Sequence, residues 1–161
     1  MTTQAIDRQM QAKLVEKPAF TIVGMVTRTK PGDPSMMQLW MDFDGQKERV
    51  RGQVSRGVFY GASDNYDPQT TEFDYLAGVA VKPGQAAPEG MVAWEIPAQT
   101  YAVFETTLAE IGDTIGYIYG PWMAGSDFQR THGPDFELYE EDFDGQDPSS
   151  KVYVHIPVKE K

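Results

Sequence analysis

Apolar and polar residues alternate along several short stretches of the chain and follow helical spacing in others, which predicts a mixed α and β fold. Alternation over Phe20 to Thr29 and the apolar runs Gly57 to Gly61 and Phe73 to Val81 predict three strands. The apolar residues between Ser35 and about Val50 fall on one helical face. Lys82-Pro83-Gly84 then ends this half of the chain, because proline and glycine set turn geometry.

The second half of the chain shows the same order of elements. Met91 to Glu105 alternates as a long strand, and Thr107 can cap the helix that follows. That helix is expected to end at Gly120-Pro121, because proline cannot continue the hydrogen-bond ladder. Phe136 to Phe143 and Val152 to Val158 predict the two closing strands.

Matches at a constant offset between the two halves indicate an internal duplication. The pairs that share this offset are Pro18-Ala19 with Pro97-Ala98, Trp40 with Tyr119, and Tyr60 with Tyr139. We therefore expect an α+β fold of two βαββ units, repeat 1 over about 18–83 and repeat 2 over about 91–159. Residues 1–17 would be an N-terminal arm, and 18–161 a single domain. Pseudo-two-fold symmetry would give one antiparallel sheet, two helices and a central cleft, where ligands commonly bind.

Charge and composition narrow the classes of function. The 161 residues include 24 acidic residues against 14 Lys and Arg, a formal net charge of −10. Direct nucleic-acid binding is not expected, because DNA is held mainly through Lys and Arg. The chain has no cysteine, which excludes thiolate metal sites and cysteine nucleophiles and fits a reducing compartment. We find no signal peptide or membrane span in the sequence, so we expect a cytoplasmic protein.

Neither a metal nor a cofactor is expected. His132 and His155 stand alone in the sequence, and the acidic residues between Glu140 and Asp147 lack the spacing of a calcium loop. Nucleotide-binding loops and the serine-hydrolase motif are also absent from the sequence.

Glu137 is the main candidate for a functional residue. It lies between Phe136 and Leu138, and strand alternation places Glu137 and Tyr139 on one face. A carboxylate in apolar surroundings is unfavourable unless paired, and a cationic ligand would supply the pair. The alternatives are a solvent-exposed sheet face, or a carboxyl with a raised pKa that acts as a general base.

Aromatic residues are the second set of candidates. Ring faces attract cations, so aromatic side chains could form the walls of the cleft, with ordinary core packing as the alternative. The candidate wall residues are Tyr60, Tyr139, Trp122 and Tyr153. Trp40 is expected in the core.

Several segments resemble the effector-binding domain superfamily. They are Phe73 to Val81, Ile96 to Phe104, Tyr119 to Trp122, Asp135 to Glu140 and Val152 to Val158. That superfamily includes gyrase-inhibitor-like (GyrI-like) proteins, ligand domains of AraC-type and MerR-type multidrug regulators, and stand-alone integron-cassette proteins. The resemblance implies the duplicated βαββ fold and a ligand-contacting glutamate at Glu137, with aromatic contacts at Trp122 and Tyr153.

Three functions are consistent with this pattern. The first is a stand-alone sensor or drug-binding protein for an aromatic or cationic amphipathic molecule. The segment before Pro18 is too short for a DNA-binding domain, so control of transcription would need a separate protein partner. The second is a hydrolase of strained electrophiles in which Glu137 activates water, although binding without turnover is favoured. The third is inhibition of DNA gyrase through the acidic surface. The sequence leaves the natural ligand and the oligomeric state open.

Overall fold

The structure, a computed structural model, describes residues 11–161, so most of the expected N-terminal arm lies outside the described residues. The elements along the chain are β1 (Lys13–Lys17), β2 (Phe20–Thr29), α2 (Ser35–Asp44), a 3-10 turn (Lys47–Arg49), β3 (Phe59–Asp64), β4 (Phe73–Val81), β5 (Val92–Ile96), β6 (Gln99–Thr107), α3 (Ile111–Tyr117), a π-helical turn (Ile118–Trp122), α4 (Met123–Gly125), β7 (Phe128–Arg130), β8 (Asp135–Tyr139) and β9 (Lys151–Glu160). Within the described range, no helix is long and apolar enough to cross a membrane.

The expected α+β fold class is confirmed. The order β2-α2-β3-β4 returns as β6-α3-β8-β9. Eight strands form one antiparallel sheet in the order β1-β6-β9-β8-β3-β4-β2-β5, and β7 pairs with β9 off this path. The two halves meet at the centre of the sheet, where β3 pairs with β8 and Gly61 lies opposite Glu137. This central pairing places Glu137 at the boundary between the two repeats.

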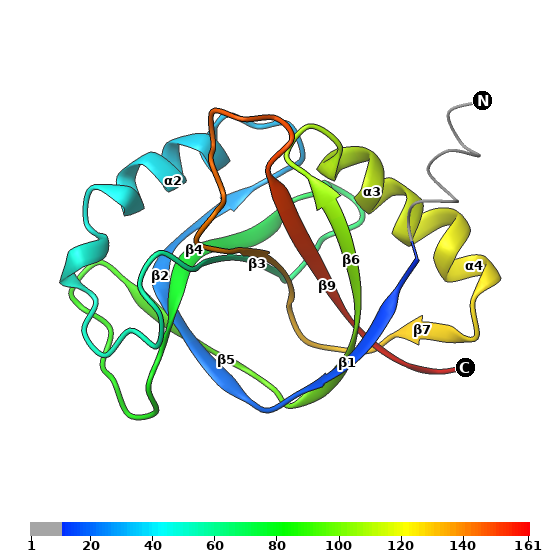
Figure 1. Cartoon of the computed structure of the whole chain (residues 1–161), viewed down its shortest axis with the longest axis horizontal. Helices are drawn as coiled ribbons and strands as arrows, with labels where there is room; N and C mark the ends of the chain where they lie inside the picture. The colour runs from blue at the N-terminus through cyan, green and yellow to red at the C-terminus, as the bar shows by residue number, and fades with distance from the viewer. Residues whose placement is uncertain (1–10) are drawn as a thin grey trace.

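The two ends of the sheet approach each other through two long, kinked strands. The ladders β1–β6 and β2–β5 follow one continuous antiparallel register. The residue numbers of each pair have the same sum in both ladders, as for Lys13 with Val103 and Phe20 with Ile96. The same two stretches of chain therefore remain partners on both sides of the kinks at Pro18 and Pro97, where proline removes a ladder donor. The expected long strand from Met91 is thus two strands, and the sheet curls into a ring (Figure 1).

The helices lie outside this ring, as Figure 1 shows for α2 on one side and α3 with α4 on the other. Buried residues under α2 are Val23, Leu39, Phe43, Tyr75, Ala77 and Val79. Buried residues under α3 and the π-helical turn are Ala102, Phe104, Ile118, Val154 and Ile156. A third cluster on the opposite face of the sheet contains Ile22, Tyr60, Leu76, Tyr101 and Phe136. Glu137 pairs with Val154, so it lies on the helix-covered face, between the clusters of the two repeats.

The second helix does not end at Gly120-Pro121, as the sequence had predicted. Pro121 lies inside a π-helical turn, and the helical path continues through Met123 to Gly125. A π-helical turn replaces the usual hydrogen-bond spacing by a longer one, which accommodates a residue without an N–H donor. Two further boundaries also moved: α2 ends at Asp44, and the strand expected to reach Phe143 ends at Tyr139.

Candidate functional site

Two tyrosines hold the carboxylate of Glu137. Its Oε1 accepts hydrogen bonds from the hydroxyls of Tyr139 at 2.6 Å and Tyr75 at 3.1 Å. The indole Nε1 of Trp40 donates in turn to the Tyr75 hydroxyl oxygen at 3.1 Å. A chain of donors therefore runs from α2 through β4 to β8 and fixes one carboxylate oxygen.

The other oxygen of Glu137 is available for a ligand. Oε2 accepts no hydrogen bond from the described residues. It is also not fully enclosed, because no buried side-chain oxygen in residues 11–161 lacks a hydrogen-bond partner. Glu137 forms no ion pair within that range either. The site thus presents one accessible, unpaired carboxylate oxygen.

Aromatic rings surround this carboxylate. The ring of Trp40 lies edge to face with Tyr139, at a centroid distance of 5.6 Å, and with Phe59 at 6.4 Å. Phe143, from the loop after β8, lies edge to face with Tyr139 at 4.8 Å. The edge-to-face contacts join rings from α2, β3 and β8 into one wall beside Glu137.

Gly61 leaves the room that this arrangement needs. A Cβ atom at this position would lie 2.1 Å from the Tyr75 hydroxyl oxygen and 3.0 Å from Glu137 Oε1. Any larger residue would force Tyr75, which is buried, away from the carboxylate. Glycine opposite Glu137 is therefore a condition for the Tyr75 hydrogen bond.

Gly61→Ala is expected to lower the free energy of unfolding by about 1–2 kcal/mol, because overpacking a buried site displaces its neighbours. Chemical denaturation of the two proteins measures the difference. Gly116→Ala is the control, since a Cβ there meets nothing within 4 Å. Equal stability of Gly61→Ala and the wild type would contradict the close packing described here.

Burial raises the pKa of Glu137 from 4.5 to about 7. The hydrogen bonds from Tyr139 and Tyr75 oppose this rise, since they favour the charged form, and the nearby charge of Asp135 adds to it. The carboxyl therefore changes charge near neutral pH, which makes its ionisation sensitive to any cation that approaches.

A second carboxylate lies beside Glu137 on the same face of β8. Asp135 Oδ2 accepts a hydrogen bond from the Tyr119 hydroxyl at 2.6 Å. Arg130 Nε donates to the oxygen of the same hydroxyl at 3.1 Å, while its other nitrogens donate to backbone carbonyls of Thr131 and Gly133. Burial is the main cause of a raised pKa for Asp135. Two carboxylates with phenol donors thus share this face.

The structure brings Glu137 and Tyr139 together as predicted but does not bring Tyr60 to them. Tyr60 pairs with Leu138 and packs against Phe136 in the cluster on the opposite face. Gly61 lies at the position of repeat 1 that corresponds to Glu137. The sequence comparison paired the two repeats at the offset that relates Tyr60 to Tyr139. The offset from Gly61 to Glu137 differs from that one by an odd number of positions. An odd shift moves a strand residue to the other face.

Two other predicted contacts also lie away from Glu137. Trp122 packs edge to face on Phe104 at 5.0 Å in the cluster under the second helix. Tyr153 pairs with Leu138, which places it on the face opposite Glu137. The sequence prediction missed Tyr75, and it placed Trp40 in the core, against which Trp40 does pack, without its hydrogen bond to Tyr75. No local pattern indicates either residue, because each reaches Glu137 from a different element.

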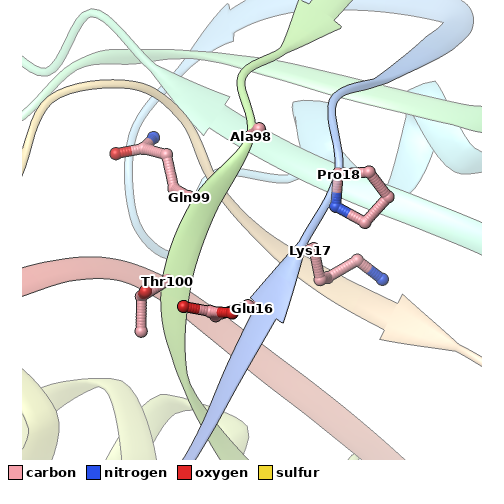
Figure 2. A pocket seen from close by; sticks show the side chains of 6 residues that line it. All are labelled: Glu16, Lys17, Pro18, Ala98, Gln99 and Thr100. Atoms are coloured by element: carbon pink, nitrogen blue, oxygen red, sulfur yellow. The ribbon is translucent and has the colours of Figure 1, made fainter.

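A hollow of about 460 Å³ lies elsewhere, where β1 runs beside β6. Its lining residues are Glu16, Lys17, Pro18, Ala98, Gln99 and Thr100. Figure 2 shows the side chains of Lys17 and Gln99 extending to opposite sides, so these polar groups do not converge on one point. Gln99 instead donates to the backbone of His132. This hollow is therefore a weaker candidate than Glu137.

The described residues contain no cluster of three or more His, Asp or Glu side chains that could hold a metal ion. His155 is buried on the opposite face and stacks on Phe136 at 4.4 Å. Burial lowers its pKa to about 4. A neutral histidine packed in this way serves the core.

The fold and a family match now identify the class of protein. The architecture is that of the gyrase-inhibitor-like effector-binding superfamily, as the sequence resemblance predicts. Residues 13–158 match the family described as Cass2, integron-associated effector binding protein, and the chain belongs to this family.

Individual relatives support this assignment. Transcriptional regulator BrlR of Pseudomonas aeruginosa is 38% identical over 155 residues, which cover 94% of this chain and 56% of BrlR. The chain thus spans little more than half the length of that relative. Similar solved structures include an integron cassette protein of Vibrio cholerae, with 20% identity, a TM-score of 0.59, and coverage of 93% of this chain and 97% of that one. Another is SAV2435 bound to tetraphenylphosphonium, with 18% identity, a TM-score of 0.68, and coverage of 93% and 94%. At these identities the structures show the fold alone.

Proposed function

We propose that this effector-binding protein takes a small organic cation, aromatic or amphipathic, at the carboxylate of Glu137. The observation that carries the proposal is the accessible Oε2, which has no partner within residues 11–161, beside a wall of aromatic rings. A cation held there would gain both a charge partner and contacts to ring faces. The edge-to-face rings of Trp40, Tyr139 and Phe143 would have to shift to admit a large ligand.

The relatives support both the ligand class and a regulatory role. The solved structure of SAV2435 is bound to tetraphenylphosphonium, a lipophilic aromatic cation, and BrlR is a transcriptional regulator. We propose that this chain acts as a cytoplasmic sensor whose occupancy is read by a DNA-binding partner or module. The chain's own net charge of −10 does not favour direct contact with DNA.

Titration with a rhodamine dye, followed by tryptophan quenching, tests the proposal. Glu137→Gln is expected to weaken binding at least about tenfold at pH 8, or about 1.4 kcal/mol, because the amide keeps the shape and removes the charge. Trp40, beside Tyr139, is a built-in reporter.

Glu140→Gln is the matched control, since Glu140 is exposed and follows the same strand. Equal binding by the wild type and Glu137→Gln would overturn Glu137 as the cation contact. That result would favour the hypothesis in which the acidic surface binds a protein such as gyrase.

A hydrolase is the second candidate, and the pKa of Glu137 favours it. A carboxyl with a pKa of about 7 can accept a proton from water at neutral pH. Incubation with a strained electrophile such as an epoxide distinguishes the two. Turnover that is lost in Glu137→Gln would identify a hydrolase, whereas binding without product formation would identify a sensor.

A further inference from the structure

We infer that Asp135 is a second anionic contact of the ligand site, so that the site prefers flat molecules with two cationic centres over monocations of the same shape. This inference rests on the proposed function and specifies its ligand class.

The register places the two carboxylates side by side. Asp135 and Glu137 alternate with Phe136 on β8, so they share a face at a separation of roughly 6.6 Å along the strand. Across the central ladder they lie opposite Ser63 and Gly61, two of the smallest residues. No bulky side chain of β3 therefore stands directly opposite either carboxylate.

The charges of this pair are not neutralised by direct ion pairs within the described chain. Asp135 is bound by the neutral hydroxyl of Tyr119, and Arg130 reaches that hydroxyl and two backbone carbonyls. Arg130 thus forms no direct ion pair with Asp135, but its charge lies near enough to oppose the rise in the pKa of Asp135. The charge of Asp135 opposes the ionisation of Glu137, and a ligand with one cationic centre for each carboxylate would relieve this repulsion.

One aromatic residue from each helical segment is linked by hydrogen bonds to each carboxylate. Trp40 lies in α2 and Tyr119 in the π-helical turn of the second repeat, and the two were paired by their offset in the sequence. Trp40 reaches Glu137 through Tyr75, and Tyr119 reaches Asp135 directly. Although its hydroxyl is engaged, Tyr119 is 42% exposed, so part of this residue can contact a ligand. A flat molecule could lie against both rings with one cationic centre near each carboxylate.

Two probes of similar outline test the inference: methyl viologen, a flat bipyridinium dication, and N-methylphenylpyridinium, the corresponding monocation. Wild-type protein at pH 8 is expected to bind the dication at least about tenfold more tightly, as measured by calorimetry. Asp135→Asn is expected to abolish most of this preference while leaving the affinity for the monocation within about threefold. Asp142→Asn, which removes an exposed acid from the following loop, should leave the preference unchanged.

The outcomes separate this inference from the function on which it rests. The inference fails and the proposed function stands if Glu137→Gln weakens binding of the monocation but the wild type prefers the dication less than threefold. If neither probe binds, or if Glu137→Gln does not weaken the monocation, the proposed function fails as well. A preference that survives in Asp135→Asn also overturns the role of Asp135. The wild-type ratio decides the question even if that variant does not fold.

Discussion

At pH 8, Glu137→Gln is expected to raise the free energy of unfolding by about 2–3 kcal/mol. The folded protein holds the pKa of Glu137 at about 7, against 4.5 ordinarily, so folding disfavours the charged form. Each unit of difference corresponds to about 1.4 kcal/mol. Because the pKa of Glu137 is higher in the folded state, Glu137 contributes fully to stability below pH 4.5. That contribution is lost as the pH rises through 7. Glutamine never ionises, and its amide oxygen can still accept both phenol hydrogen bonds.

Urea unfolding at pH 8 and at pH 5 measures this effect. The gain from Glu137→Gln should be largest at pH 8 and should fall to about 1 kcal/mol or less at pH 5. Glu140→Gln, at an exposed position, should change the stability little at either pH. A loss of stability in Glu137→Gln at pH 8 would show that the carboxylate is stabilised by the fold and is not available for a cation.

The fold does not require a carboxylate at the position of Glu137, because the other repeat has a different residue there. Gly61 of repeat 1 corresponds to Glu137 and lies directly opposite it, so glycine is tolerated at this position in one half of the fold. Two equivalent glutamates would place two charges on the pseudo-two-fold axis with only the phenols of one site to bind them. One glutamate and one glycine instead give a single site with room for the Tyr75 hydroxyl. A partly buried carboxyl with a perturbed pKa is typical of functional positions.

The sequence predicted the parts of this site that depend on local periodicity. Alternation along one strand placed Glu137 and Tyr139 on one face, and the repeated order of elements predicted the α+β fold. The failures concern relations between elements. Tyr60 was predicted to line the cleft beside Glu137, because it is related to Tyr139 by the same offset that relates Trp40 to Tyr119. The chain between the helix and the central strand differs in length between the repeats by an odd number of positions, which turns Tyr60 to the other face.

Long-range contacts explain the remaining omissions. Tyr75 and Trp40 are ordinary apolar positions of their own strand and helix, and only the packing of α2 over β4 directs their polar atoms to Glu137. Pro121 reads as a helix stop because sequence rules assume regular α-helical hydrogen bonding, which the π-helical turn does not have. Sequence alone thus predicted the pairing of Glu137 with Tyr139, and only the three-dimensional packing adds Tyr75 and Trp40.

The affinity for a permanent cation is expected to fall about 100-fold between pH 8 and pH 5. A cation binds the ionised form of Glu137, and with a pKa of about 7 only about 1% of the carboxyl is ionised two units lower. The direction of this pH dependence follows from the raised pKa of Glu137. The affinity for the cation is constant above pH 7 and falls about tenfold per pH unit below it. Burial keeps the pKa of His155 at about 4, so this residue stays neutral over most of the range.

Calorimetry with tetraphenylphosphonium, whose charge does not depend on pH, measures this dependence. Binding should release a proton near pH 6, so the apparent enthalpy should change with the ionisation enthalpy of the buffer. Glu137→Gln should bind weakly at every pH and should match the wild type near pH 5, because the protonated acid and the amide are both neutral. A wild-type affinity that does not change between pH 8 and pH 5 would mean that the cation contacts the aromatic rings alone. The proton released on binding is therefore the most direct sign that Glu137 is the charge partner of the ligand.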